Sequence, residues 1–338
     1  MDIDQLKVTV SRLLAGNKGL LAMDESTGTA NKRFKALNIP ETEDYRRKYR
    51  QLIVTAPDLE QYISGAILFD ETIHQKADDG GLLLDILKEK GIVPGIKVDE
   101  GAVDLTNFPR EKITEGLDGL AARLKDYAGQ GLKFAKWRAV ITIGKDIPTL
   151  TSIKANAMVL ARYAALCQEA GLVPIVEPEV LMDGDHSLQR CAQVTELVLN
   201  TVFDALYEMR VALNGMILKP NMVLPGADSS VQDGVDAVAD ATVQCFLRSV
   251  PAAVPGIAFL SGGQSAELAT QRLNTMHLKY PHMPWALTFS FSRAIQQPAL
   301  EKWAGNDEHV AVAQQLLVER AALNSAARAG KYTADMEK

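Results

Sequence analysis

Lysine and carboxylate side chains stand at the ends of several short apolar segments of this chain. Lys219 ends one segment directly before Pro220, and Glu177 ends another directly before Pro178. Because a residue that precedes proline is disfavoured in a helix, we expect both side chains at the ends of strands. A lysine becomes a nucleophile when a second ammonium and an apolar pocket lower its pKa, and a neighbouring carboxylate can transfer the protons. The pattern therefore favours Schiff-base chemistry at Lys219.

Other charged residues follow the same pattern. Lys136 is the ammonium that we expect beside Lys219, and Glu179 is a second carboxylate after Glu177. Lys136 and Arg138 are two positions apart, so their side chains point to the same side of a strand. Each residue taken alone is best explained by an ion pair or a solvated strand end, but several lysines in apolar strands are costly to bury without a function. Further polar residues at strand ends are Asp24, Glu25, Ser26, Lys97, Asp99, Asn221 and Ser290.

Two groups of residues are suited to binding phosphate. Ser261-Gly262-Gly263 follows the seventh apolar run, and Arg293 follows the eighth. Glycine lets backbone N–H groups approach an anion, although an ordinary Gly-Gly turn is the alternative for this segment alone. Lys32 and Arg33 form a second cationic group after the first run, close to Thr29. Two separated cationic sites suit a substrate that carries a phosphate at each end.

The elements that position these side chains are eight short apolar runs, each separated from the next by enough residues for a helix. This pattern is typical of βα units around a parallel sheet. Eight units fit a single (β/α)8 TIM barrel of parallel strands and surrounding helices, in which the C-terminal strand ends converge on the active site. Periodicity alone leaves an open doubly wound sheet as the alternative. The runs are Gly19–Met23, Ile63–Phe69, Ile92–Val98, Phe134–Val140, Leu172–Val176, Met216–Leu218, Ile257–Leu260 and Ala286–Phe289.

Helical periodicity is clearest between Thr149 and Gly171, which supply a start and a stop signal. Apolar residues from Ile153 to Cys167 recur every three or four positions, and segments 43–51 and 310–329 also favour helices. We expect residues 1–338 to form one catalytic domain, with a short N-terminal helix and a short C-terminal tail.

Composition restricts the class of protein. Apolar residues make up 47% of the chain and charged residues 23%, and the net charge is −6. An acidic chain without a basic face is not expected to bind nucleic acid or an anionic membrane. Three isolated cysteines, no signal peptide and no membrane-spanning stretch indicate a cytoplasmic protein. The sequence contains no HExxH pair, so it gives little support for a zinc site.

Longer motifs contain these residues. Together they resemble the motifs of class I (Schiff-base) fructose-1,6-bisphosphate aldolases from about residue 15 to residue 333. The motifs are Leu21–Thr29, Ala77–Gly80, Gly95–Asp99, Phe134–Arg138, Val173–Glu179, Leu218–Met222, Phe259–Gln264, Pro284–Ser290 and Gly330–Thr333.

The resemblance implies a reaction and a role for each residue. Fructose 1,6-bisphosphate would be cleaved reversibly to dihydroxyacetone phosphate and glyceraldehyde 3-phosphate, with Lys219 forming the iminium. Asp24 would accept the C4 hydroxyl proton, Glu177 would be the acid–base group with Glu179 balancing charge, and Lys136 would keep Lys219 neutral. The family needs no metal or organic cofactor and commonly forms homo-oligomers, often tetramers. The residues implied in substrate binding are Arg138 beside the reacting carbons, Ser261, Gly262, Ser290 and Arg293 at the C1 phosphate, and Lys97, Arg33 and Thr29 at the hydroxyl groups and the C6 phosphate.

Two departures from the family pattern affect this assignment. Ser292 stands where the family usually has glycine before the arginine, so the C1-phosphate loop can differ in shape. The sequence ends at Lys338, whereas many relatives continue to a terminal tyrosine that assists protonation of the enamine. We therefore expect another group or water to protonate it here, an expectation contradicted if removal of residues 334–338 selectively abolishes that step.

Two other functions are compatible with parts of the pattern. Another lysine-dependent barrel, such as a transaldolase or deoxyribose-phosphate aldolase, would need only one phosphate site. A catalytically silent barrel used as a binding scaffold would be expected to lose its lysine or carboxylates, and Lys219, Glu177 and Asp24 are all present.

Overall fold

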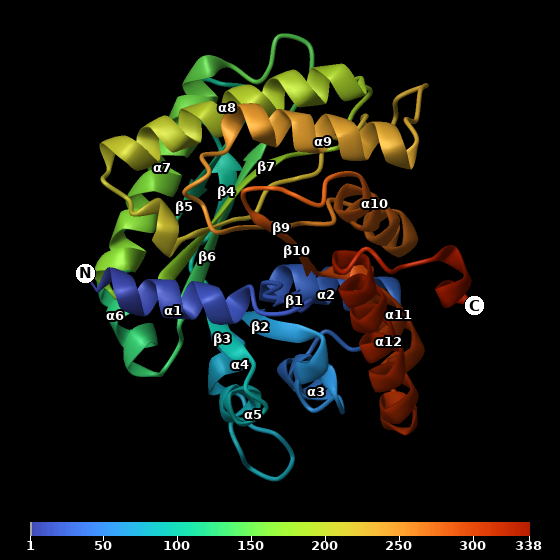
Figure 1. The fold of residues 1–338 in the computed structure, drawn as a ribbon. Helices are drawn as coiled ribbons and strands as arrows, with labels where there is room; N and C mark the ends of the chain where they lie inside the picture. The colour runs from blue at the N-terminus through green and yellow to red at the C-terminus, as the bar shows by residue number, and fades with distance from the viewer. Residues whose placement is uncertain (1) are drawn as a thin grey trace.

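A computed structural model, which describes residues 2–338, contains a closed barrel of eight parallel strands (Figure 1). Neighbouring strands follow the order β1, β10, β9, β8, β7, β6, β3, β2 around the barrel, so β1 closes it between β2 and β10. The TIM-barrel prediction is confirmed. The strands are β1 Gly19–Met23, β2 Ile63–Leu68, β3 Val93–Lys97, β6 Phe134–Ile141, β7 Val173–Val180, β8 Ile217–Leu218, β9 Gly256–Phe259 and β10 Ala286–Phe291.

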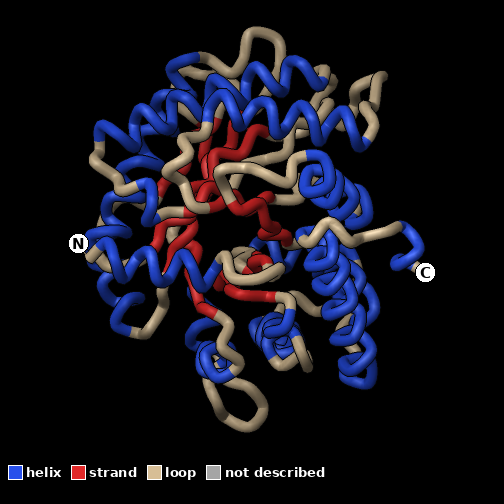
Figure 2. The backbone as a smooth tube through the Cα atoms, viewed as in Figure 1, coloured by secondary structure: helices blue, strands red, loops and turns tan. Residues whose placement is uncertain are grey.

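Helices surround the strands on the outside of the barrel, as Figure 2 shows. Thr149, which the sequence predicted as the start signal of a helix, is the N-cap residue of α7. Its side chain accepts a hydrogen bond from the Ser152 N–H. The helices are α1 Ile3–Leu13, α2 Thr27–Ala36, α3 Glu43–Val54, α4 Asp70–His74, α5 Leu83–Glu89, α6 Leu120–Gly129, α7 Leu150–Glu169, α8 Leu188–Glu208, α9 Val235–Ser249, α10 Ala266–Lys279, α11 Arg293–Trp303 and α12 Val310–Arg328.

All eight predicted strand runs overlap a barrel strand, but three strands continue beyond their predicted ends. β6 does so by one residue, to Ile141. β7 continues to Val180, so Glu177 and Glu179 lie within the strand. β10 continues to Phe291 and therefore includes Ser290. For β7 and β10 the predicted strand was ended at the first polar residue because it was defined by apolar content alone. The backbone pairing of both strands continues through that residue. A short antiparallel hairpin of β4 Gly101–Asp104 and β5 Lys112–Glu115 was not predicted.

Helix α1 closes the N-terminal end of the barrel, where it lies across the strands (Figure 1). Its buried residues Leu6, Val10 and Leu13 join the apolar cluster inside the barrel. Gly95 is required there, because a side chain on its Cα would reach within 2.2 Å of the Phe134 ring. The interior side chains of this cluster are Leu20, Ala22, Ile67, Val93, Phe134, Val173, Ile175, Ile217 and Ala258.

The other end of the chain packs on the outside of the barrel. Glu337 contacts Arg320 of α12 at 2.5 Å and accepts a hydrogen bond from the Tyr332 hydroxyl at 2.9 Å. Within residues 2–338, no helix is both long and apolar enough to cross a bilayer.

Candidate active site

A cavity of about 250 Å³ opens at the C-terminal ends of the barrel strands. Each residue to which the sequence gave a catalytic or substrate-binding role lines this cavity. These residues come from four strands (β3, β6, β7 and β10), from the segments directly after β1, β8 and β9, and from α2 and α11. The residues that line it are Ala22, Asp24, Glu25, Ser26, Thr29, Arg33, Lys97, Lys136, Arg138, Glu177, Glu179, Lys219, Leu260, Ser261, Gly262, Ser290, Ser292 and Arg293. Lys32, which was grouped with Arg33 in the sequence, is exposed and does not line it.

Glu177 lies between two buried lysines at the base of the cavity. Its Oε1 is 3.1 Å from the Lys219 Nζ, and its Oε2 is 3.4 Å from the Lys136 Nζ. The three side chains are only 4–5% exposed. No hydrogen bond within the described chain satisfies the Glu177 Oε2. A carboxylate in this position can exchange protons with an adduct on Lys219 while Lys136 supplies a fixed positive charge.

Lys136 remains an ammonium because three carboxylates surround it. Its Nζ is 2.8 Å from Asp24, 3.4 Å from Glu177 and 3.8 Å from Asp99. Burial by itself opposes the charge, but the attraction of Asp24, Glu177 and Asp99 outweighs it and raises the pKa of Lys136. The cation is thus retained in a pocket that would otherwise favour a neutral amine.

Asp24 is held in its ionised form by the same cluster. Burial by itself raises the pKa of the carboxyl group, but the charges of Lys136 and Lys219 outweigh that effect and lower it to about 2. The Asp24 side chain is 12% exposed at the cavity wall. It can therefore accept a proton from a bound ligand near neutral pH.

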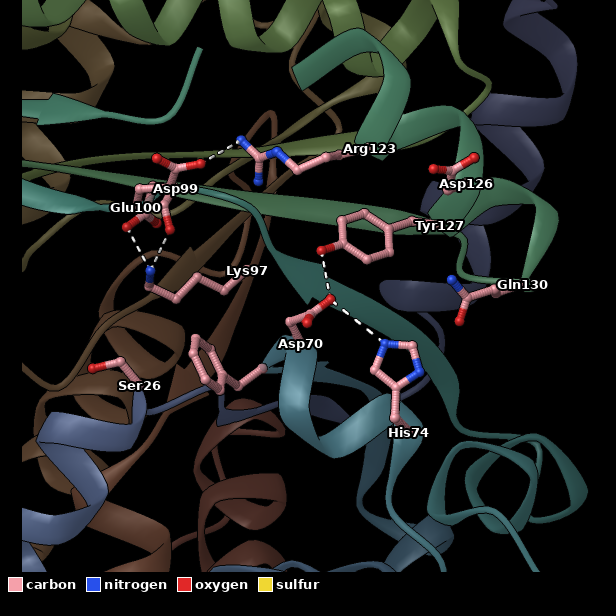
Figure 3. A pocket seen from close by; sticks show the side chains of 11 residues that line it. Ser26, Asp70, His74, Lys97, Asp99, Glu100, Arg123, Asp126, Tyr127 and Gln130 are labelled. Atoms are coloured by element: carbon pink, nitrogen blue, oxygen red, sulfur yellow. Dashed lines mark hydrogen bonds and ion pairs between the residues drawn. The ribbon is translucent and has the colours of Figure 1, made fainter. Parts of the chain in front are cut away.

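Two further ion pairs flank this centre. Arg138 forms a close pair with Glu179, and although burial opposes the charge, this carboxylate raises the pKa of the guanidinium. Lys97 pairs with Asp99, whose Oδ1 is 2.7 Å from the Lys97 Nζ (Figure 3). Asp99 also accepts a hydrogen bond from the Arg138 backbone N–H at 3.3 Å. These pairs fix the orientation of side chains on β3, β6 and β7.

Hydroxyl and backbone groups from the last two loops line another part of the cavity. Ser290 is 1% exposed, and its Oγ has no hydrogen-bond partner within the described chain. Gly262 has a φ of +58°, a conformation that glycine adopts without strain. Arg293, at the first position of α11, is exposed at the rim. An unsatisfied buried hydroxyl beside a glycine turn and an arginine suits an oxyanion ligand.

A second cavity of about 580 Å³ adjoins the first and is shown in Figure 3. Ser26 and Lys97 line both cavities. On its far side the Tyr127 hydroxyl donates to Asp70 at 2.7 Å, and His74 lies 3.8 Å from the same carboxylate. Lys97 therefore stands at the boundary between the two spaces.

The sequence named several of these residues without giving them a role. Asp99 holds Lys97 and approaches Lys136, and Glu25 binds Arg33 and Arg50 at 2.6 Å each. Asp99 and Glu25 are buried. In the sequence, their position just after an apolar run was the signal that could have identified them as site residues. Arg50 carries no such signal, because it lies in the middle of α3.

The fold and the cavity together define a (β/α)8-barrel enzyme whose site is a buried lysine within a carboxylate cluster. A sequence model of the family "Fructose-bisphosphate aldolase class-I" matches residues 5–338. A "Probable fructose-bisphosphate aldolase class 1" of Xanthomonas campestris pv. campestris is 54% identical over 333 residues, which are 98% of this chain and 99% of the relative. "Fructose-bisphosphate aldolase 4, cytosolic" of Arabidopsis thaliana is 51% identical over 95% of this chain and 81% of the relative.

The fold is also shared with a solved structure. A Plasmodium falciparum fructose-bisphosphate aldolase, crystallised with TRAP and a small-molecule inhibitor, superposes with a TM-score of 0.96 at 47% identity and covers 98% of this chain and 96% of its own. The chain belongs to the class I fructose-bisphosphate aldolase family.

Proposed function

We propose that this chain cleaves fructose 1,6-bisphosphate reversibly to dihydroxyacetone phosphate and glyceraldehyde 3-phosphate through a Schiff base on Lys219. The observation that supports it most directly is the carboxylate of Glu177, which contacts both Lys219 and Lys136 beside the ionised Asp24. A nucleophile, a proton-transfer group and a second base are thus within one small cavity.

The neutral amine of Lys219 attacks the C2 ketone and forms a carbinolamine. Glu177, which has taken the proton that Lys219 lost on becoming the neutral amine, gives it to the departing hydroxyl group, which leaves as water, and an iminium remains. Asp24 then takes the proton of the C4 hydroxyl as the C3–C4 bond breaks. The electron pair of that bond moves into the iminium to form an enamine, and glyceraldehyde 3-phosphate leaves. Lys136 supplies a fixed positive charge beside the reacting groups.

The two phosphate groups occupy separate parts of the cavity. Ser261, Gly262, Ser290 and Arg293 hold the C1 phosphate, supported by the unsatisfied Ser290 hydroxyl. Lys97, Thr29 and Arg33 serve the hydroxyl groups and the C6 phosphate. Arg138 lies beside the reacting carbons with Glu179, which balances its charge.

Reductive trapping tests the central step. Borohydride reduction in the presence of dihydroxyacetone phosphate, followed by peptide mapping, is expected to label Lys219. A parallel reaction without the ketone is the control and is expected to give no label. A label on Lys136, Lys97 or any other residue, or no label at all, would contradict the proposal. Competition by mono- and bisphosphate sugars separates this function from that of single-phosphate lysine aldolases, because a bisphosphate should compete best.

We also infer the setting in which the enzyme works. Residues 1–338 act as one catalytic domain, since β1 and β10 from opposite ends of the chain both line the cavity. A homo-oligomer, of which the tetramer is the common form in this family, is supported by apolar side chains exposed on α8 and α9, where Leu197 is 45% and Leu247 49% exposed. A cytoplasmic location is supported by the relatives named cytosolic. Light scattering on the purified chain tests the oligomer.

A further inference from the structure

We propose that Ser292 is a positioning residue that joins Arg33 to the junction between β10, which carries Ser290, and α11, which begins at Arg293, so that phosphate binding in the cavity depends on the contact between Ser292 and Arg33. This inference rests on the proposed function and assigns a role to the position at which the chain departs from its family. It concerns substrate affinity and leaves the covalent chemistry on Lys219 unchanged.

The Ser292 hydroxyl lies at the centre of a polar cluster. Its Oγ donates to the Glu25 Oε1 at 2.8 Å and accepts a hydrogen bond from the Arg33 Nη2 at 3.2 Å. The Gln296 Nε2 lies 3.3 Å from the same Oγ and donates to the Ala22 carbonyl oxygen at 2.6 Å. A glycine at this position would have none of these contacts. Side chains from α2, the end of β1 and α11 are therefore linked through one hydroxyl group.

Ser292 occupies the N-cap position of α11 but does not use its side chain as a cap. Its backbone has a φ of −105° and a ψ of −88°, and its side chain makes no capping hydrogen bond. An N-cap serine ordinarily accepts a hydrogen bond from an N–H of the first turn. Because the hydroxyl is directed to Glu25 and Arg33, no side-chain cap occupies the beginning of α11, where an anion is favoured.

Glu25 anchors this cluster to the barrel. Its Oε2 is 2.6 Å from the Nη1 of Arg50, which is 3% exposed, and its Oε1 is 2.6 Å from the Nη1 of Arg33. Burial by itself raises the pKa of Glu25, but Arg50 and Arg33 outweigh it and lower the pKa, with the Ser292 hydroxyl adding to the effect. Glu25 keeps both arginines when the serine hydroxyl is removed, so the loss affects orientation more than folding.

The position of Ser292 links it to phosphate binding. It stands between Ser290, whose buried hydroxyl has no partner in the described chain, and Arg293 at the rim of the cavity. Its side chain contacts neither Lys219, Glu177 nor Asp24 in any hydrogen bond. Loss of the hydroxyl should therefore weaken phosphate binding through a less fixed Arg33 and loop, with little change in the reaction of the bound substrate.

A double-mutant cycle with Arg33 tests this coupling. Ser292→Ala is expected to raise KM for fructose 1,6-bisphosphate about 5- to 10-fold, the net effect of one ordinary hydrogen bond, with kcat within about 2-fold. Ser292→Gly should give the same loss or a larger one, and Ser292→Thr, which keeps the hydroxyl, should restore most of the affinity. In an Arg33→Ala background, Ser292→Ala should change KM by less than about 2-fold. Gln297→Ala, which removes a side chain of α11 that bonds to Glu301 and not to the Ser292 cluster, is the matched control and should behave like the parent chain.

Other outcomes would overturn the proposal. These are additive effects of the two substitutions, a fall in kcat without a change in KM, or no rescue by threonine. A large fall in thermal stability of Ser292→Ala would assign the serine to folding instead. The same double-mutant cycle can be measured without turnover, from the affinity of each variant for inorganic phosphate determined by calorimetry. If Lys219 is not labelled by borohydride, the proposed function fails, and the phosphate cycle still decides the role of Ser292.

Discussion

The two ends of the barrel interior are built from opposite kinds of side chain. At the N-terminal end, Leu6, Val10 and Leu13 of α1 pack on an entirely apolar cluster. At the C-terminal end, Lys136, Glu177 and Lys219 are 4–5% exposed yet charged or able to become charged. Burial is nearly the same at both ends, so the difference lies in what burial does to free energy.

Apolar burial stabilises the fold, whereas burial of charge costs free energy that the partners of each ion only partly return. The conformation of the charged end is maintained because each of these three side chains has an opposite charge nearby, and the apolar end supplies stability for the whole barrel. This division predicts that substitutions at the C-terminal end change rates and that substitutions at the N-terminal end change folding. The four predictions that follow test the division, from the largest expected effect to the smallest.

Lys219→Arg should have the largest effect. The positive charge near Glu177 is kept, but a guanidinium cannot lose its proton and cannot form the Schiff base. We expect kcat to fall by about 10⁴-fold or more, with no borohydride label and little change in the thermal midpoint. Steady-state kinetics and calorimetry measure the two quantities. Residual turnover within about 10-fold of the parent enzyme would show that Lys219 is not the nucleophile.

Glu177→Gln should have the next largest effect. The amide keeps the size of the side chain but cannot transfer a proton, so we expect kcat to fall by roughly 10²- to 10⁴-fold. The rate of borohydride trapping should fall in parallel, because carbinolamine dehydration is the step affected. Glu179→Gln is the matched variant on the same strand and should lose less, since Glu179 pairs with Arg138 and not with a lysine. Equal losses would remove the distinction between the two carboxylates.

Leu13→Ala tests the apolar end. Leu13 is fully buried, and its truncation should lower the free energy of unfolding by about 2–5 kcal/mol while kcat stays within about 2-fold. Val8 lies on the same helix but is 61% exposed, so Val8→Ala is the control and should change stability by less than about 0.5 kcal/mol. Urea unfolding measures both. A large loss of kcat in folded Leu13→Ala would mean that the two ends are not independent.

The barrel could be predicted from sequence because its physical signals are local. Each strand is an apolar run of a few residues, and α7 has its own apolar stripe and start signal. Strand length was less predictable at β7, where Glu177 and Glu179 continue the backbone pairing although they are charged. Where a strand ends depends on its pairing with the neighbouring strands, and the pattern of hydrophobic residues along the sequence does not show that pairing.

Candidate side chains could be predicted, but their partners could not. Lys219 and Glu177 carry a visible signal, a charge at the end of an apolar run before proline. The contact between Ser292 and Arg33 joins residues far apart in the sequence and depends on how the barrel closes. The same is true of Arg50 and Glu25, which pair across the space between α3 and the end of β1. Closure of β1 against β10 brings Ser292 to Arg33, and the packing of α3 on the barrel brings Arg50 to Glu25, so only the three-dimensional structure reveals these contacts.

The smallest effect concerns the acid stability of the charged end. The pKa of Asp24 is about 2 in the folded chain against an ordinary value of 3.8, because Lys136 and Lys219 outweigh its burial. Between these values the unfolded chain binds more protons, so the stability that Asp24 contributes above about pH 4 is lost as the pH falls towards 2. The contribution is roughly 2 kcal/mol, and Asp24→Asn should lack it.

Urea unfolding of the parent chain and Asp24→Asn at a series of pH values measures this contribution. The difference in unfolding free energy should be largest above pH 4 and should shrink towards pH 2. Asp4→Asn, in which a carboxylate that is 90% exposed is neutralised, should show little difference at any pH. A difference between the parent and Asp24→Asn that does not vary with pH would mean that the amide disturbs packing. In that case Lys136 and Lys219 do not stabilise the charge of Asp24.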